Sequence, residues 1–133
     1  FGIETNWSPD GAWLLYSRES RKGLQLYLLH PATRRTTQLN LSGIASKCAW
    51  SPESTALYCA VPGTELAAGN LNGSQDSFIK ISIANIDREP ETLVSVADGG
   101  FADARDLMYS PMQNALVYKN FKDGRLYLLS LAK

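Results

Sequence analysis

Short runs of alternating hydrophobic and polar residues follow one another along most of the chain, and the 3.6-residue periodicity of amphipathic helices is weak. Clusters of Gly, Pro, Ser, Asn and Asp separate the runs and are typical of tight turns. We therefore predict an all-β fold. The expected strands cover residues 2–7, 12–18, 24–29, 35–39, 45–50, 55–61, 78–83, 92–96, 104–109, 115–119 and 125–131.

One motif occurs three times: an aromatic residue, then Ser-Pro, a turn, and an apolar strand. Its copies begin at Trp7, Trp50 and Tyr109, so the intervals between them are 43 and 59 residues. A period near 43 residues is typical of a four-stranded propeller blade. The segment 62–77, which is rich in Gly and polar residues, provides the extra length of the second interval. We expect the three aromatic side chains, at equivalent positions, to wedge between neighbouring blades.

The repeat predicts a β-propeller segment of three four-stranded antiparallel blades, the last lacking its fourth strand. Residues 1–133 would form one partial β-propeller domain. Its expected divisions are blade 1 at 1–42, blade 2 at 43–101 with an insertion at 62–77, and blade 3 at 102–133. Because a closed propeller has roughly four to eight blades, we expect this sequence to be a fragment. The remaining blades of the parent chain, or a second copy arranged as three plus three, would complete the ring.

A resemblance to the TolB-type WD-like propeller repeat rests on Trp-Ser-Pro-Asp-Gly at 7–11, the apolar strand after it, and Leu-Tyr-Leu-Leu at 26–29 and 126–129. The Gly-His and Trp-Asp signatures of true WD repeats are absent. Ser54 and Gln113 stand where the pattern has Gly, so we expect their turns to differ. In the third turn Asn114 is expected to take the positive-φ position. The resemblance implies a scaffold or accessory role, and the repeat itself carries no catalytic residues.

The two cysteines are expected to face each other across a hairpin. If residues 52–55 form its loop, Cys48 lies directly opposite Cys59, with Cβ atoms roughly 4.5–5.5 Å apart. A small adjustment then permits a disulfide, whereas the alternative is two buried free thiols. A disulfide would indicate an oxidising, extracytoplasmic compartment: the periplasm, the cell surface or the secreted fraction. The same pairing rule places Thr5 opposite Tyr16 in blade 1, and Leu107 opposite Tyr118 in blade 3.

Residues that could carry chemistry are few. The single histidine, His30, is expected in a solvated turn, and the sequence contains neither a zinc-binding spacing nor a Gly-x-Ser-x-Gly elbow. Three aspartates before the third repeat are expected to be turn or solvation residues: Asp98, Asp103 and Asp106. We therefore predict no catalytic residues, no cofactor and no metal site.

The insertion is the candidate binding loop, because loops on a rigid scaffold often carry binding residues. Its polar side chains could contribute to a ligand or partner contact. Their oxygens could also serve a weak calcium site, although the regular carboxylate spacing of an EF-hand loop is missing. The alternative is an unspecialised surface loop. The candidate binding residues are Asn70, Asn72, Gln75 and Asp76.

Thirteen basic and thirteen acidic side chains give a formal net charge of zero. This balance argues against a nucleic-acid surface, and no apolar run is long enough to span a bilayer. We therefore predict no nucleic-acid binding and no membrane insertion by this segment. A protein or peptide is the expected type of ligand.

Together these features favour a non-catalytic β-propeller scaffold or binding module that binds a protein, peptide or glycan outside the cytoplasm. The alternative is the N-terminal gating propeller of a prolyl-oligopeptidase-like serine peptidase, whose catalytic domain would follow this segment. A Gly-x-Ser-x-Gly motif downstream in the gene would favour the peptidase. A third interpretation is an excised or designed half-propeller.

Overall fold

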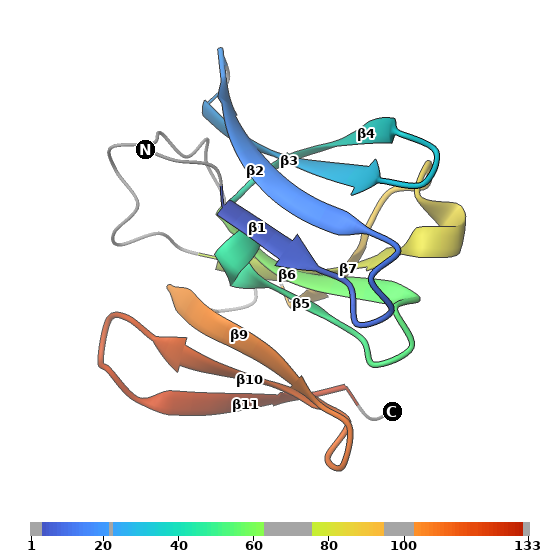
Figure 1. Ribbon diagram of the computed structural model, residues 1–133. Helices are drawn as coiled ribbons and strands as arrows, with labels where there is room; N and C mark the ends of the chain where they lie inside the picture. The colour runs from blue at the N-terminus through green and yellow to red at the C-terminus, as the bar shows by residue number, and fades with distance from the viewer. Residues whose placement is uncertain (1–3, 22, 63–75, 95–102, 132–133) are drawn as a thin grey trace.

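Three antiparallel sheets make up the computed structural model, which describes residues 4–21, 23–62, 76–94 and 103–131. The sheets follow one another along the chain and lie face against face, from blue through green and yellow to red in Figure 1. Two sheets have four strands, and the third has three within the described residues. This arrangement confirms the prediction of an all-β propeller segment with three blades.

Within each blade the strands are neighbours in chain order. Blade 1 contains β1 (Glu4–Trp7), β2 (Leu14–Ser20), β3 (Gly23–His30) and β4 (Arg35–Ser42). Blade 2 contains the 3₁₀ turn η1 (Ala45–Lys47), β5 (Cys48–Trp50), β6 (Ala56–Pro62), β7 (Asp76–Ser82), the 3₁₀ turn η2 (Ile83–Asn85) and β8 (Glu91–Val94). Blade 3 contains β9 (Ala104–Ser110), β10 (Ala115–Asn120) and β11 (Leu126–Ser130).

The predicted pairing of the first hairpin is correct in two blades. Thr5 lies opposite Tyr16 in blade 1, and Cys48 lies opposite Cys59 in blade 2. In both hairpins a short loop with fixed ends sets the register, which then continues residue by residue along the strands.

Tyr118 of blade 3 faces a bulge in β9, so the predicted one-to-one pairing with Leu107 becomes two residues, Asp106 and Leu107, between the pairs Val117–Met108 and Lys119–Arg105. The register of β10 against β9 shifts between Val117 and Lys119. Asp106 has a φ of 54°, in the left-handed region, and this conformation accommodates the extra residue of the bulged strand. Nothing in the hydrophobic pattern of this strand indicates the bulge.

One residue with positive φ follows each Ser-Pro turn. These residues are Gly11 (73°), Ser54 (60°) and Asn114 (47°). The prediction for Asn114 is confirmed. The Gly of the first copy is therefore replaced by Ser in the second and by Asn, one position later, in the third.

The insertion in blade 2 is bounded more tightly than predicted. Pro62 is the last residue of β6 and lies opposite Asp76, the first residue of β7. A charged residue is tolerated at this buried position because its carboxylate is paired with Lys47. The intervening residues, 63–75, lie outside the described residues.

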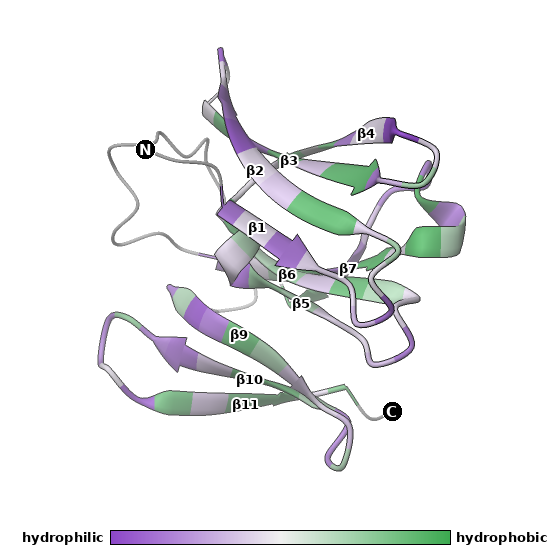
Figure 2. Ribbon diagram, viewed as in Figure 1, coloured by the Kyte–Doolittle hydropathy of each residue, from purple (hydrophilic) through white to green (hydrophobic). Residues whose placement is uncertain are grey.

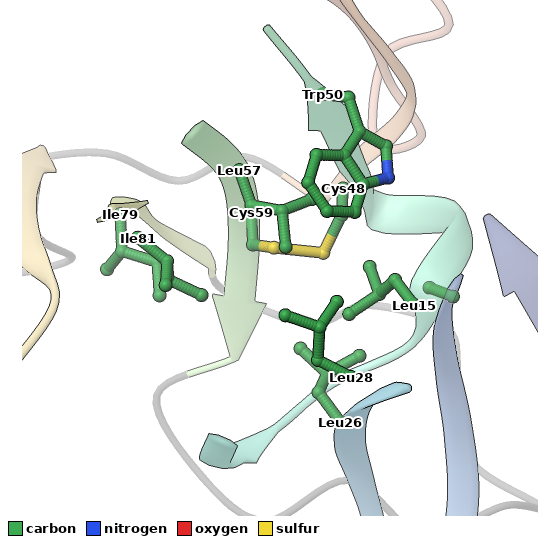
Figure 3. Close-up of a cluster of buried hydrophobic side chains, with 10 residues drawn as sticks. Leu15, Leu26, Leu28, Cys48, Trp50, Leu57, Cys59, Ile79 and Ile81 are labelled. Carbon is green, nitrogen blue, oxygen red and sulfur yellow. A yellow bond between two sulfur atoms is a disulfide. The ribbon is translucent and has the colours of Figure 1, made fainter. Parts of the chain in front are cut away.

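The seam between blades 1 and 2 is a hydrophobic core (Figure 3). Leu15, Leu26 and Leu28 of blade 1 are all 0% exposed. From blade 2 they meet a set of buried apolar side chains and cysteines: Cys48, Trp50, Leu57, Cys59, Ile79 and Ile81. The predicted wedge position of Trp50 is confirmed.

The seam between blades 2 and 3 is more aromatic. Tyr58 of β6 and Tyr109 of β9 stack with ring centroids 5.6 Å apart. Phe78 of β7 and Tyr118 of β10 lie 4.9 Å apart. Tyr109 thus occupies the wedge position between blades that the repeat predicts.

Each end of the segment exposes an apolar face. Leu126 and Leu128 of β11 are equivalent in the repeat to Leu26 and Leu28 of β3, yet they are 75% and 53% exposed. Figure 2 shows this hydrophobic strand at the lower edge of the molecule, where no described sheet covers it. At the other end Trp7 is 54% exposed, and among the described blades it has no neighbour to wedge against. The chain therefore presents two faces that have the residue pattern of an inter-blade seam.

Candidate functional site

The structure describes one of the four predicted binding-loop residues, Asp76. Asn70, Asn72 and Gln75 lie outside the described residues, so their role stays a prediction. Asp76 lies in β7 and is 0% exposed, whereas a solvated loop position was expected. Its carboxylate belongs to a buried group of charges.

This group, the ion cluster, consists of Lys47, Asp76, Asp103 and Arg105. Lys47 Nζ lies 2.5 Å from Asp76 Oδ2 and 2.9 Å from Asp103 Oδ1. Arg105 donates to both oxygens of Asp103, from Nε at 3.1 Å and from Nη2 at 3.2 Å. The backbone N–H of Ala104 donates to Asp76 Oδ2 at 2.9 Å. Asp103 is 0% exposed, so the expectation that it is a solvated turn residue is wrong.

The ion cluster joins two blades. Lys47 and Asp76 belong to η1 and β7 of blade 2, whereas Asp103 and Arg105 lie at the start of β9. Two positive and two negative side chains balance, and this offsets part of the penalty for removing charges from water. Asp76 Oδ1 is the one buried side-chain oxygen or nitrogen that has no hydrogen-bond partner in the described part of the chain. Because its charges are already paired with one another, we assign the cluster a structural role.

Cys48 and Cys59 form a disulfide across the first hairpin of blade 2, with Cα atoms 4.1 Å apart. Both residues are buried, at 3% and 0% exposure, in the seam that faces blade 1. The bond therefore cross-links β5 and β6, the first two strands of blade 2.

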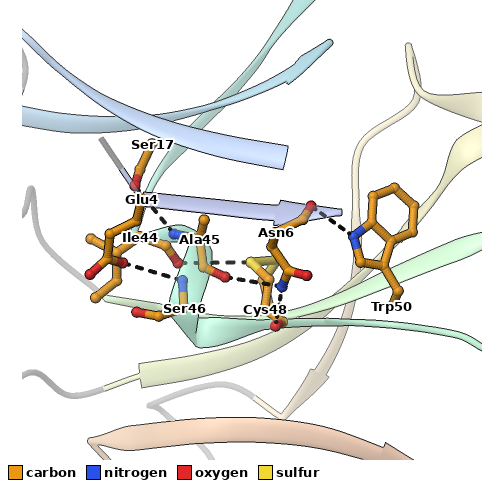
Figure 4. Close-up of a disulfide and its surroundings, with 9 residues drawn as sticks. Glu4, Asn6, Ser17, Ile44, Ala45, Ser46, Cys48 and Trp50 are labelled. Carbon is orange, nitrogen blue, oxygen red and sulfur yellow. Dashed lines mark hydrogen bonds between the residues drawn. A yellow bond between two sulfur atoms is a disulfide. The ribbon is translucent and has the colours of Figure 1, made fainter. Parts of the chain in front are cut away.

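The first strand of blade 1, β1, is hydrogen-bonded to blade 2 around this disulfide (Figure 4). Asn6 Nδ2 donates to the backbone oxygens of Cys48, at 2.9 Å, and Ala45, at 3.3 Å. Trp50 Nε1 donates in return to the backbone oxygen of Asn6 at 3.2 Å. The backbone N–H of Ala45 donates to Ser17 Oγ at 3.3 Å. These bonds, together with the hydrophobic seam, hold blades 1 and 2 in a fixed relation.

A groove runs along this fixed seam, between β4 of blade 1 and residues 86–90 of blade 2. We call it the seam groove. It consists of two adjoining cavities of about 480 and 450 Å³ that share Thr37, Ile86 and Asp87. Trp13 lines the first cavity, and Leu39 lines the second.

Charged side chains border the seam groove without an ion pair to any other described residue. They are Arg35, Asp87, Arg88 and Glu89. The groove therefore offers charges of both signs beside hydroxyl groups and partly apolar surface. Sequence reasoning missed it because its walls come from three separated segments, and the only hint is the run of polar residues in β4.

His30 is half-buried at the first cavity of the groove, at the end of β3. Its ring meets the ring of Trp13 edge to face, with centroids 4.5 Å apart. Its Nδ1 lies 3.1 Å from Thr33 Oγ1. The side chain is thus more enclosed than the solvated turn residue that the sequence suggested.

A smaller cavity of about 320 Å³ lies in the seam between blades 2 and 3. It is lined in part by Tyr58, Lys80 and Glu91, and Lys80 Nζ is 6.0 Å from the centroid of the Tyr58 ring. Burial raises the pKa of Tyr58, and the neighbouring Tyr109 and acidic side chains raise it further. The phenol therefore stays protonated in the seam across the neutral pH range.

The described residues contain no group of three His, Cys, Asp or Glu side chains that could hold a metal ion. A search of the same residues finds no helix with the length and hydropathy needed to cross a membrane.

No family model matches the sequence, and no curated protein matches it. Solved structures do match the fold. TolB from Acinetobacter baumannii superposes with a TM-score of 0.61 and 13% identity, over 99% of this chain and 32% of that chain. A putative TolB from Agrobacterium tumefaciens gives 0.62 and 15%, over 94% and 40% of the two chains. A chain of a nidogen/laminin complex gives 0.52 and 10%, over 97% and 46%.

At these identities the likeness establishes the fold, which is that of a TolB-type β-propeller segment. The chain spans between 32% and 46% of the length of each of these matched chains. Other blades complete a partial propeller of this kind, and the two exposed apolar faces are where such blades would pack.

Proposed function

We propose that this protein is a non-catalytic β-propeller scaffold that binds a protein, a peptide or a glycan outside the cytoplasm. The observation that carries the proposal is the seam groove, which is open, partly apolar and bordered by charges without ion-pair partners among the described residues. The blades that form it are held together by the buried seam and the bonds around Asn6. A preformed site of this kind loses little conformational entropy on binding.

The disulfide supports the proposed location outside the cytoplasm. Disulfides persist in oxidising environments and are rare in the cytosol, and the bond between Cys48 and Cys59 lies buried in the core. Alkylation in denaturant, after acid quenching of the cells to trap thiols and disulfides, followed by mass spectrometry tests this part of the proposal. Neither cysteine should be modified without prior reduction, and two alkylated thiols would contradict an oxidising location.

One matched structure supports a protein as the ligand class, because it is a complex of two proteins, nidogen and laminin. A propeller of similar fold is thus present in a protein–protein complex.

Photo-crosslinking in cells tests whether this protein binds a macromolecule. A benzoylphenylalanine at Gln38, on the seam groove, should give a discrete adduct with a second protein on irradiation. The same group at Lys119, exposed on blade 3, is the matched control for chance collisions. A glycan array probed with the purified protein tests the glycan class. If Gln38 gives no adduct beyond the control and the array shows no binding, the proposed function is wrong.

The gating propeller of a serine peptidase remains the alternative prediction. It requires a catalytic domain in the same protein, so the complete open reading frame separates it from the scaffold: a downstream Gly-x-Ser-x-Gly would favour it.

A further inference from the structure

One wall of the seam groove is the edge of a strand. Side chains of a strand alternate between its two faces, so consecutive residues line the same cavity only where the cavity reaches the strand's edge. Arg35, Thr36 and Thr37 all line the first cavity. Thr37, Gln38 and Leu39 all line the second. β4 is also the outermost described strand of its sheet, with β3 as its neighbour, so its outer backbone N–H and C=O groups border the groove.

From this geometry we propose that the seam groove binds an extended peptide, which adds to β4 as a fifth strand of blade 1. The inference rests on the proposed function and names its ligand and its site. In strand addition the main-chain hydrogen bonds supply affinity, and pockets for alternate side chains supply specificity. Both are present here, since the strand edge and the two cavities lie along the same line.

The edge of β4 suits strand addition better than the outer edge of blade 2. β4 covers eight residues, Arg35–Ser42, and contains no Pro and no Lys, the residues that commonly block strand edges. It pairs with β3 without interruption over Arg35–Gln38, and its register shifts between Gln38 and Ser42, so the regular part of this edge is the first half of the strand. β8 covers only four residues, Glu91–Val94, and follows Pro90, which has no N–H to donate. A peptide would therefore find a longer row of backbone groups on blade 1.

The lining of the groove defines the peptide's side chains. Arg35 and His30 line the first cavity from blade 1, where a carboxylate of the peptide would meet the Arg35 guanidinium, and Asp87 lines the same cavity from blade 2. Leu39 and Leu41 of the second cavity, and Ile86 shared by both, are partly buried and pack on the core, where an aliphatic side chain would cover them. The expected ligand is an extended segment of a partner protein that carries an acidic residue and, further along, an aliphatic one.

The aromatic side chains of the groove favour a peptide over a sugar. Trp13 is half-buried, and its ring meets His30 edge to face at 4.5 Å. The two rings therefore pack against each other and do not present one flat, open surface on which a pyranose could stack. The glycan is kept as an outcome of the experiment.

Peptide display supplies the probe. Random linear peptides selected on the protein should share an acidic residue followed or preceded by an aliphatic one. A synthetic selected peptide should bind the Arg35→Glu variant at least about fivefold more weakly, because an exposed attractive pair becomes repulsive. The matched control is Arg21→Glu, an exposed arginine in the turn before β3, which should bind within about twofold of the wild type. Backbone amide exchange of the bound protein should slow in β4 and stay unchanged in β11.

Reversing the charge on both the protein and the peptide distinguishes lost binding from a folding defect. A peptide with Lys in place of its acidic residue should regain affinity for Arg35→Glu, which a misfolded variant would not show. Affinity that does not depend on Arg35, or slowed exchange at β11 instead of β4, would overturn the groove inference and leave the binding function standing. The groove inference would also be overturned if a glycan bound to the protein and peptide display selected no peptide. If display, the glycan array and crosslinking all fail to give a ligand, both the groove inference and the proposed function are wrong.

Discussion

Lys47 and Asp76 form a buried ion pair, with Nζ 2.5 Å from Oδ2 and the two side chains 2% and 0% exposed. The same ammonium lies 2.9 Å from Asp103 Oδ1, so one cation serves two carboxylates at the junction of blades 2 and 3. Removing that cation would leave Asp76 without its cationic partner and Asp103 with Arg105 alone among the described cations. The charge pairing at this junction therefore depends on a single lysine.

Replacing Lys47 by Met should lower the free energy of unfolding by about 3–5 kcal/mol, the usual loss when one partner of a buried pair is removed. Urea denaturation followed by tryptophan fluorescence measures the change. Lys119→Met is the matched control, because Lys119 is exposed on β10 and its loss should cost less than about 0.5 kcal/mol. Equal urea midpoints for the two variants would show that the ion cluster does not stabilise the junction.

The disulfide should stabilise the folded chain mainly by restricting the unfolded one. A bond between residues 11 apart in sequence is worth about 3 kcal/mol in the chain-entropy description. The double variant Cys48→Ala, Cys59→Ala should therefore unfold at a lower urea concentration than the oxidised wild type. Reductant should destabilise the wild type to a similar extent and leave the variant unchanged. A reduced wild type with two measurable thiols and an unchanged midpoint would contradict this account.

Ser54 has a backbone in the left-handed region and a side chain that accepts a hydrogen bond, and two substitutions separate these effects on stability. Its backbone has a φ of 60°, and its Oγ accepts a hydrogen bond of 3.1 Å from the N–H of Asp10 in the neighbouring blade. Ser54→Ala loses the hydrogen bond and keeps a Cβ in the left-handed region, whereas Ser54→Gly loses the bond but relieves the backbone. The Gly variant should be more stable than the Ala variant by about 1 kcal/mol, as thermal or urea unfolding will show. An Ala variant as stable as the Gly variant would mean that this turn is not strained.

Features that depend on nearby residues could be predicted from the sequence. The spacing of the aromatic-Ser-Pro motif predicts the length of a blade, because each copy of the motif forms the first hairpin of one blade. A loop of fixed length then places Cys48 opposite Cys59. The same reasoning fails at Asp106, where a residue with positive φ lies at a shift in register. No Gly, Pro or Asn in this strand indicates the shift.

Apart from the wedge positions of Trp50 and Tyr109, which the repeat predicts, the contacts between blades could not be predicted in this way. Lys47 and Asp103 are 56 residues apart, and each looks like an ordinary surface charge in the sequence. The tetrapeptide Leu-Tyr-Leu-Leu occurs twice, yet Leu26 is fully buried and Leu126 is 75% exposed. Burial in a repeat protein is set by the neighbouring unit, so identical local sequences have different surroundings. The seam groove was missed for the same reason.

Asp10 should make the stability of the first turn sensitive to acid. The hydroxyl of Ser8, and then the backbone N–H of Ala12, donate to its carboxylate and lower the pKa of Asp10. Since the folded pKa lies below the unfolded one, the stabilisation is present above about pH 4 and is lost as pH falls through the folded pKa. Asp10→Asn should therefore lose less stability than the wild type between about pH 5 and pH 2. Urea midpoints across this range measure how stability changes with pH in each variant. If Glu53→Gln alters this pH dependence as much as Asp10→Asn does, the effect comes from the overall charge and not from Asp10.

The exposed apolar face of blade 3 should drive association of this chain. Leu126 and Leu128 occupy the positions at which Leu26 and Leu28 bury themselves against the next blade, and each such side chain gains roughly 1.5–3 kcal/mol on full burial. The chain by itself should therefore sediment as a dimer or larger species. Leu126→Lys with Leu128→Lys should shift it to the monomer, whereas Met112→Lys, in a turn and 97% exposed, should not. A folded wild type that stays monomeric at high concentration would exclude completion by a second copy and leave further blades of the same protein.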